Sequence, residues 1–152
     1  MVDTTAAATG ERRPERLELR VPTSATQLPA VRAVAGDLAM RMDFDLDAVE
    51  DLRLAVDEAC ATLSAVALGD VPLTVVFEAF REGLRIDAWV PTESGVDVPR
   101  DGFGWAVLHT LVDTVEAGPS TQASVVAGDG SGSPVARIAL VKKLRQYASV
   151  AQ

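Results

Sequence analysis

Apolar and polar residues alternate near the start of the chain, over residues 16–21, which is the period of a half-buried strand. Apolar residues then recur at helical spacing from Leu28 to about Met42 and predict a helix. A second, clearer helical stripe follows, with Asp47 as the predicted N-cap and Glu50 completing a capping box. This helix is expected to end at Gly69-Asp70. Its stripe consists of Val49, Leu52, Val56, Ala59, Leu63 and Val66.

The second half of the chain predicts two hairpins separated by a helix. A polar loop over residues 91–102 leads into that helix, and the last hairpin turns at the glycine-rich segment 128–132. Residues from Lys142 onward are expected to form a short tail. The predicted elements are strands over 73–80 and 84–90, a helix over 103–115, and strands over 121–126 and 135–141.

This order of elements predicts an α+β fold. Hairpins leave no room for the crossover helices of a doubly wound parallel sheet. A two-layer α/β sandwich, with a mostly antiparallel sheet and the helices on one face, fits best. The 152 residues suit one compact domain. We expect it to span residues 16–145, between a flexible tail over 1–15 and a C-terminal tail over 146–152.

The charge balance narrows the class of partner. Acidic residues outnumber basic ones 22 to 14, which gives a formal net charge of −8. Nucleic acid and anionic membranes repel such a field, so neither is expected as a partner. No stretch approaches the roughly 18 apolar residues of a membrane span, and the N-terminus lacks the apolar core of a signal peptide. We therefore expect a cytoplasmic protein that binds proteins or small molecules.

The chain has one cysteine, Cys60, and one histidine, His109. These counts exclude an intrachain disulfide, a thiolate metal cage and any mechanism that needs two imidazoles. Cys60 lies beside the apolar stripe and is interpreted as a small buried hydrophobe. His109 precedes Asp113 by four residues on a predicted helix, and a surface pair is favoured over a catalytic dyad.

Glu58 and Thr62 are the first candidates for chemistry. They are four residues apart on the long helix, so their side chains share a face beside the apolar stripe. A carboxylate and a hydroxyl at the rim of a cleft suit a general base and a magnesium ligand. An ordinary solvated helix face explains the same spacing, and both interpretations stay open here.

Glycines in and after the polar loop are the second candidates. Gly95 follows the 84–90 strand, and Gly102-Phe103-Gly104 opens the next helix. Glycines at a helix start let a ligand approach the backbone, and the N-terminal amides favour a phosphate. A plain loop-to-helix junction explains them equally well.

The order of these signals resembles the GHKL (Bergerat-fold) ATPases, and within them the anti-sigma factors of the RsbW type. The run Asp51-Leu52-Arg53-Leu54-Ala55-Val56-Asp57-Glu58-Ala59-Cys60 is similar to their first ATP-binding helix. The segment from Gly102 to Asp113 is similar to their glycine box and the helix after it. Residues 136–144 resemble their last strand, so the resemblance spans about residues 16–145.

The resemblance implies a protein that binds ATP and Mg²⁺, sequesters a sigma factor of the sigma-F or sigma-B type, and phosphorylates a serine of an anti-anti-sigma factor (a STAS-type antagonist). It implies that Glu58 activates the serine hydroxyl and that Thr62 stands at the magnesium position. It also implies that Glu93, Gly95, Gly102 and Gly104 bind the nucleotide, and that the chain forms a homodimer through the segment 17–21.

Three positions depart from the family pattern. Thr62 replaces an asparagine, Glu93 replaces the aspartate that reads adenine, and Asp97 replaces a glycine and is expected to add negative charge. Two hypotheses follow: an active anti-sigma kinase, or a binding scaffold with a vestigial pocket that is regulated by competition between partners. A third is a small ATPase or signalling fragment unrelated to sigma factors.

Overall fold

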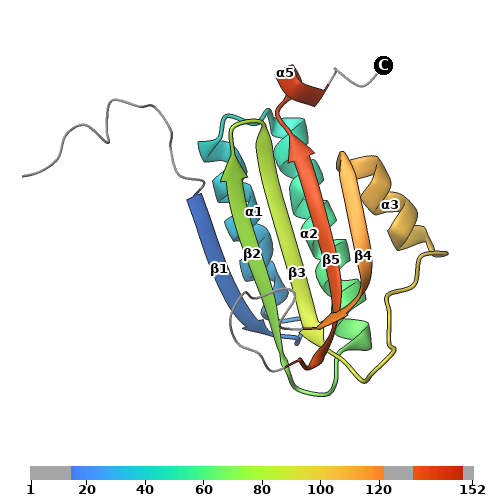
Figure 1. Cartoon of the computed structure of the whole chain (residues 1–152). Helices are drawn as coiled ribbons and strands as arrows, with labels where there is room; N and C mark the ends of the chain where they lie inside the picture. The colour runs from blue at the N-terminus through green and yellow to red at the C-terminus, as the bar shows by residue number, and fades with distance from the viewer. Residues whose placement is uncertain (1–14, 122–131, 149–152) are drawn as a thin grey trace, which may run out of the picture.

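The computed structural model describes residues 15–121 and 132–148 (Figure 1). The predicted N-terminal tail lies outside these residues apart from Glu15, as does the glycine-rich turn apart from Gly132. The elements are β1 (Glu15–Pro22), α1 (Leu28–Arg41), α2 (Leu46–Val66), β2 (Pro72–Phe80), β3 (Gly83–Pro91), α3 (Phe103–Leu111), β4 (Thr114–Thr121), β5 (Pro134–Lys143) and α5 (Arg145–Ala148).

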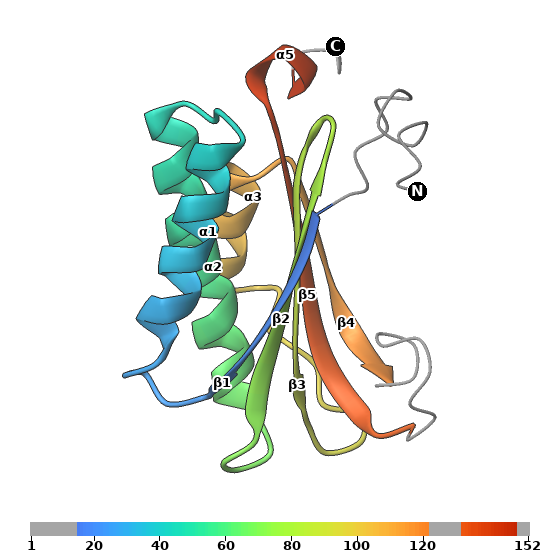
Figure 2. The same ribbon diagram turned by 90° about the vertical axis from the view of Figure 1, so that its left-hand side faces the viewer.

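The strands form one antiparallel sheet in the order β1-β2-β3-β5-β4. Viewed from the side, α1, α2 and α3 form a layer against one face of this sheet, and no helix of the described residues covers the other face (Figure 2). The two-layer sandwich predicted from the order of elements is confirmed. In the part of the chain that the structure describes, no helix is both long and apolar enough to span a membrane.

The strand register puts apolar residues in rows that face the helices. One row crosses the whole sheet, since Leu19 pairs with Val75, Val75 with Ala88, Ala88 with Ile138, and Ile138 with Ala117. Because side chains alternate between the two faces of a strand, the neighbouring residues point away from the helices. The helix-facing rows and the α2 stripe together make the main core.

Helix α2 is the central element of the helix layer. The apolar stripe predicted for it is buried at Val49, Leu52, Val56, Ala59 and Leu63. The predicted N-cap is wrong by two residues. Asp45, not Asp47, has the extended backbone of a cap, and its side chain accepts a hydrogen bond from the Ala48 amide at 2.9 Å.

The helix predicted over residues 103–115 is also too long, because α3 ends at Leu111. Val112 has an extended backbone, and the Asp113 amide donates to the Val141 carbonyl as the chain enters β4. Val112 and Val115 satisfy helical spacing, but β-branched residues also suit a strand. The next strand is predicted over residues 121–126, but β4 spans Thr114–Thr121, so the strand begins seven residues earlier than predicted. Residues 122–126 lie outside the described part of the chain.

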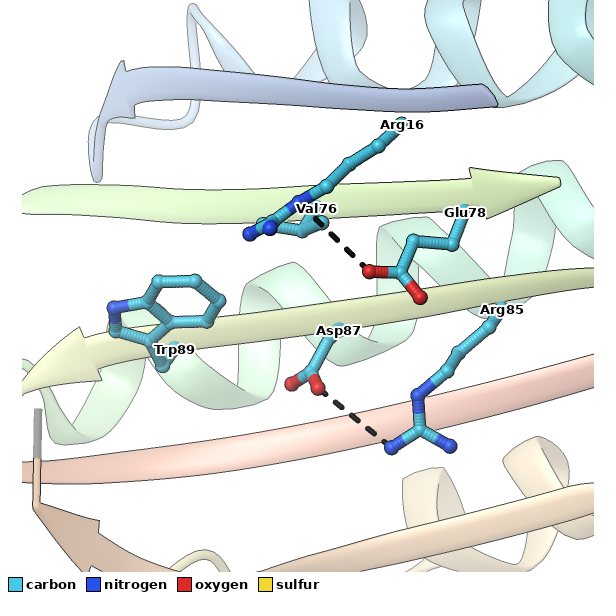
Figure 3. Close-up of a pocket in the computed structure, with 6 residues that line it drawn as sticks. All are labelled: Arg16, Val76, Glu78, Arg85, Asp87 and Trp89. Atoms are coloured by element: carbon cyan, nitrogen blue, oxygen red, sulfur yellow. Dashed lines mark ion pairs between the residues drawn. The ribbon is translucent and has the colours of Figure 1, made fainter. Parts of the chain in front are cut away.

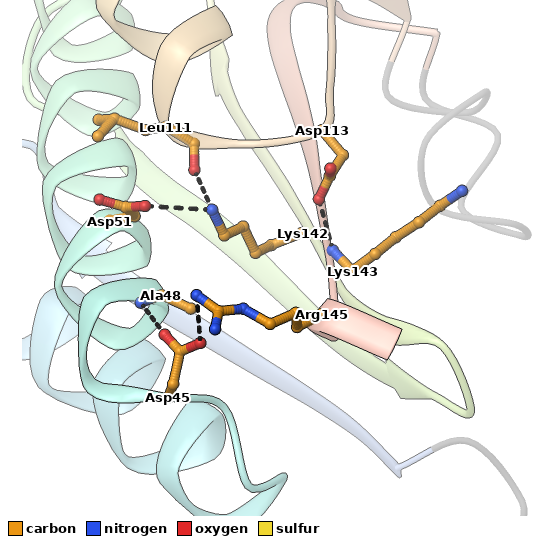
Figure 4. Close-up of polar contacts among 8 residues, drawn as sticks. All are labelled: Asp45, Ala48, Asp51, Leu111, Asp113, Lys142, Lys143 and Arg145. Carbon is orange, nitrogen blue, oxygen red and sulfur yellow. Dashed lines mark hydrogen bonds and ion pairs between the residues drawn. The ribbon is translucent and has the colours of Figure 1, made fainter. Parts of the chain in front are cut away.

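The predicted tail from Lys142 onward is corrected too. Lys142 and Lys143 belong to β5, and α5 follows them. The Lys142 ammonium donates to the Asp51 carboxylate at 3.2 Å and to the Leu111 carbonyl at 2.7 Å (Figure 4). This one side chain therefore joins β5 to α2 and to the end of α3.

Candidate functional site

The two flanks of α2 contact different helices. On one flank Asp57 pairs with Arg32 of α1 at 3.0 Å. On the other flank Glu58 lies against the first turn of α3. The apolar stripe between the flanks anchors α2 on the sheet, so the Glu58 side chain is directed to the junction of α2 and α3.

Glu58 and Gly104 are in direct contact. A Cβ atom built on Gly104 would overlap Glu58 Oε1 and would lie 2.8 Å from the carboxyl carbon of the same side chain. Only glycine leaves room for the carboxylate at this position. The structure thus brings together two of the candidate residues, which are 46 positions apart in the chain.

The Glu58 carboxylate is half-buried and lies at the positive end of the α3 dipole. Among the described residues, none donates a hydrogen bond to it or forms an ion pair with it. Acidic side chains elsewhere on α2 do have partners, as Asp51 and Asp57 show. Glu58 therefore retains its full capacity to accept a proton or a hydrogen bond from a bound molecule.

Thr62 lies one turn further along α2. Its hydroxyl donates to the Glu58 main-chain carbonyl at 2.8 Å, an internal helix bond that is common for threonine. The hydrogen is therefore engaged, while the oxygen lone pairs stay available. Thr62 lies on the same flank as Glu58, as predicted.

Glu93 and Gly95 lie on the loop after β3, and both are exposed. Gly95 has φ +80°, a left-handed conformation that favours glycine, so it serves a turn at this point. Within the described residues no hydrogen bond or ion pair joins either of them to Glu58. Gly102, by contrast, is the N-cap of α3, next to the Glu58–Gly104 contact.

Asp97 does not present a free negative charge, contrary to the expectation from the sequence. One carboxylate oxygen accepts from the Val98 amide at 2.8 Å, and the other pairs with Arg100 at 2.8 Å. The charge that replaces a family glycine is thus compensated inside its own loop.

The helix-surface pair expected between His109 and Asp113 is absent, because Asp113 lies beyond the end of α3. The Asp113 carboxylate instead accepts from the Lys143 amide at 2.7 Å (Figure 4). His109 packs edge-on against Trp105, with 4.9 Å between the ring centroids.

Cys60 lies in the main core with 1% of its surface exposed. Burial, with the nearby Asp57 charge as a smaller cause, raises the pKa of its thiol to about 12. Near neutral pH the thiol is therefore protonated and a poor nucleophile. The interpretation of Cys60 as a small buried hydrophobe is confirmed.

A second polar cluster lies on the sheet face away from the helices (Figure 3). A shallow hollow there is lined by Arg16, Val76, Glu78, Arg85, Asp87 and Trp89. Asp87 pairs with Arg85 and accepts two hydrogen bonds from Arg137. These bonds raise the pKa of Arg137 above its ordinary value. Because its charges are already paired, this hollow offers no counterpart to the free Glu58 carboxylate.

Arg100 is not among the site residues predicted from the sequence. Its spacing to Asp97 is a visible signal, since opposite charges three residues apart often pair. Its other contacts reach β4 and α3, and no local pattern predicts them.

Comparisons with known proteins identify the family to which the chain is similar. Residues 21–126 match the model of the histidine kinase-like ATPase domain. The chain is 33% identical to the anti-sigma-F factor RsbW of Mycobacterium tuberculosis, over 87% of this chain and 79% of that protein. It is 26% identical to a serine-protein kinase RsbW of Bacillus cereus, over 67% of this chain and 76% of that protein.

A solved structure of RsbU and RsbW domains from Mycobacterium tuberculosis superposes with a TM-score of 0.56 at 14% identity. The match covers 86% of this chain and 32% of that longer chain, and it supports the fold. From the family model and the curated relatives together, the chain belongs to the family of histidine kinase-like ATPase domains, among the RsbW anti-sigma factors and serine-protein kinases.

Proposed function

We propose that this chain is an anti-sigma factor. It binds a sigma factor of the sigma-F or sigma-B type in the cytoplasm and releases it when an anti-anti-sigma factor competes for the complex. The relative that carries this proposal is the anti-sigma-F factor, which is 33% identical and of which the chain covers 79%. The net charge of −8 is consistent with partners that are proteins rather than nucleic acid.

We also propose that the chain phosphorylates a serine of its antagonist with ATP. The observation that best supports this proposal is the half-buried Glu58 carboxylate. It lies at the start of α3 and has no hydrogen-bond or ion-pair partner among the described residues. In the proposed step Glu58 accepts the proton of the serine hydroxyl. The serine oxygen bonds to the γ-phosphorus as the bond to the β-phosphate oxygen breaks, and ADP leaves.

The residues on this flank of α2 are compatible with Mg²⁺. Magnesium keeps several waters and takes only one or two protein oxygens beside the phosphates. Thr62 offers the lone pairs of its hydroxyl oxygen as a ligand, while the Glu58 carboxylate stays free to act as the base. Bound Mg²⁺ would neutralise charge on the phosphates. Gly102 and Gly104 would contact the phosphates through backbone amides at the α3 N-terminus.

A binding scaffold without catalysis is the second candidate function. The Thr62 hydroxyl already bonds to the helix backbone, and Glu93 and Gly95 are exposed on their loop. Among the described residues, neither of them has a hydrogen bond or ion pair with Glu58. In such a scaffold, release of the sigma factor would depend only on competition between partners.

Calorimetric titration with ATP, with and without Mg²⁺, distinguishes the two candidates. Magnesium-dependent binding in the micromolar range supports the kinase, and the absence of any binding heat supports the scaffold.

Replacing Glu58 tests the proposed base. Glu58→Gln keeps the size of the side chain but cannot take the serine proton, so phosphorylation of the antagonist should fall at least about 100-fold. Sigma-factor binding should stay within about twofold, because the change is small and lies at the nucleotide site. Phosphate transfer is measured with labelled ATP, and sigma binding by titration.

Asp47→Asn is the matched control, since Asp47 is an exposed carboxylate in the first turn of the same helix. It should phosphorylate the antagonist like the unchanged protein. Normal transfer by Glu58→Gln would show that another group is the base.

We further propose a homodimer that pairs two copies of β1. This strand is at an edge of the sheet, and Leu17 on it is 40% exposed. In an antiparallel pairing centred on Leu19, Glu18 of each copy lies opposite Arg20 of the other. Both cross-strand pairs then join opposite charges, which stabilises such a contact.

A further inference from the structure

Arg100 contacts three separate elements. Its Nη1 atom pairs with the Asp97 carboxylate at 2.8 Å within the loop that follows β3. Its Nη2 atom donates to the main-chain carbonyl of Ala117 in β4. Its guanidinium carbon lies 5.9 Å from the ring centroid of Trp105 in α3, within the range of a cation–π contact.

The loop that contains Arg100 is also held through Asp97 and Val98. Asp97 accepts from the Val98 amide through its second oxygen, so both of its carboxylate oxygens have donors. Val98 is only 4% exposed and packs into the main core. The segment 97–100 is therefore attached to the core, to β4 and to α3 at once.

This attachment lies between the two glycine segments of the candidate site. Glu93 and Gly95 precede it on the exposed part of the loop, and Gly102 and Gly104 follow it at the start of α3. A displacement of the segment 97–100 would therefore shift the exposed loop before it, or the start of α3 after it, relative to the Glu58 carboxylate.

We propose that Arg100 is a positioning residue for nucleotide binding: it holds the loop against β4 and Trp105, and so sets the place of the α3 N-terminus opposite Glu58. The inference rests on the proposed nucleotide-binding function. The Arg100 guanidinium bonds to the Asp97 carboxylate and the Ala117 carbonyl and lies over the Trp105 ring, so the role that we assign to Arg100 is to hold the loop.

The geometry requires arginine specifically. A planar guanidinium donates in several fixed directions and also stacks on an aromatic ring. The lysine ammonium is a single point charge on a flexible stem. A lysine side chain in place of Arg100 could therefore pair with Asp97 but could not keep all three contacts.

The test compares Arg100→Ala and Arg100→Lys in the full chain by calorimetric titration with Mg·ATP. An untethered loop must be ordered on binding, so Arg100→Ala should weaken ATP binding about tenfold, which corresponds to about 1.4 kcal/mol. Arg100→Lys should lie between Arg100→Ala and the unchanged protein. Asp97→Asn should weaken binding as well, and its combination with Arg100→Ala should add little.

Arg32→Ala is the matched control, because Arg32 forms a comparable exposed ion pair with Asp57, on the other flank of α2. It should lower the thermal midpoint about as much as Arg100→Ala while leaving ATP binding unchanged. Equal ATP binding by Arg100→Ala and the unchanged protein would overturn the inference.

Hydrogen exchange separates this inference from the proposed function. If the unchanged protein binds no ATP, the nucleotide part of the proposed function fails, and the exchange of amides 93–102 then decides about Arg100. Faster exchange of these amides in Arg100→Ala, but not in Arg32→Ala, supports a positioning role. Identical exchange in all three proteins contradicts it.

Discussion

At the scale of single residues, Gly104 shows how the candidate site depends on a missing side chain. The Glu58 carboxylate occupies the space that a Cβ on Gly104 would need. The atom in conflict is the end of a flexible side chain, so an added methyl group would displace the carboxylate and leave the backbone in place. Such a change alters the chemistry of the site more than the stability of the fold.

Gly104→Ala should therefore reduce phosphorylation of the antagonist at least about tenfold, while the free energy of unfolding changes by less than about 1 kcal/mol. Transfer from labelled ATP and urea denaturation measure the two effects. Thr110→Ala is the control, because Thr110 is exposed on the same helix and its hydroxyl donates to the helix carbonyl of Ala106. Thr110→Ala should keep most of the activity, and an equal loss in both variants would count against the Glu58–Gly104 contact.

Both residues of this contact were candidates from the sequence, but their contact was not predicted. The spacing of Glu58 and Thr62 on one helix follows from local periodicity. The approach of Gly104 to Glu58 depends on the packing of α3 against α2, which no local pattern encodes. The same holds for Asp97, whose charge is compensated by Arg100 in the folded chain.

At the scale of secondary structure, the Lys142 side chain joins three elements. It comes from β5 and reaches Asp51 on α2 and the Leu111 carbonyl at the end of α3 (Figure 4). Its side chain is only 17% exposed, so water replaces these contacts poorly. A helix end that loses such a donor is left with an unsatisfied carbonyl.

Lys142→Met keeps the length of the apolar stem but removes the ammonium. It should lower the free energy of unfolding by about 1–3 kcal/mol, because a charged hydrogen-bond partner is lost inside the fold. Urea denaturation measures this change. Lys143→Met is the control, since Lys143 contributes its main-chain amide to the bond with Asp113. An equal effect of the two substitutions would contradict the bridging role of Lys142.

The boundary between α3 and β4 explains the largest error in the predicted elements. The apolar residues from Val107 to Val115 satisfy a helical period, yet the chain leaves the helix at Leu111. The Asp113 amide donates a hydrogen bond to the Val141 carbonyl of β5, and the residues after Asp113 continue this pairing as β4. Tertiary pairing with β5 therefore overrides a local periodicity that β-branched residues leave ambiguous.

At the scale of the whole molecule, the edge strand β1 is the contact of the proposed dimer. Edge strands present unpaired backbone groups, and proteins protect them with charges or cover them. Here Glu18 and Arg20 alternate with Leu17 and Leu19 and pair with each other at 3.3 Å within the strand. In the proposed dimer the two copies would exchange these partners across the edge.

Arg20→Glu should weaken the proposed dimer, because each Glu18 would then face a glutamate of the other copy. Exchanging the two charges, with Glu18→Arg and Arg20→Glu together, should restore it. Both side chains are exposed, so the fold of the single chain is preserved. Sedimentation at several protein concentrations measures the association, and identical profiles for all three proteins would exclude β1 as the contact.

The amino-acid sequence alone determined the class of the fold, the amphipathic faces of α1 and α2, and the residues able to carry chemistry. These properties follow from local periodicity and from the chemistry of individual side chains. The tertiary structure alone decided that α3 ends at Leu111, that Glu58 meets Gly104, and that Arg100 joins the loop to β4 and α3. These contacts join residues distant in sequence, and their geometry depends on how the helix layer packs on the sheet.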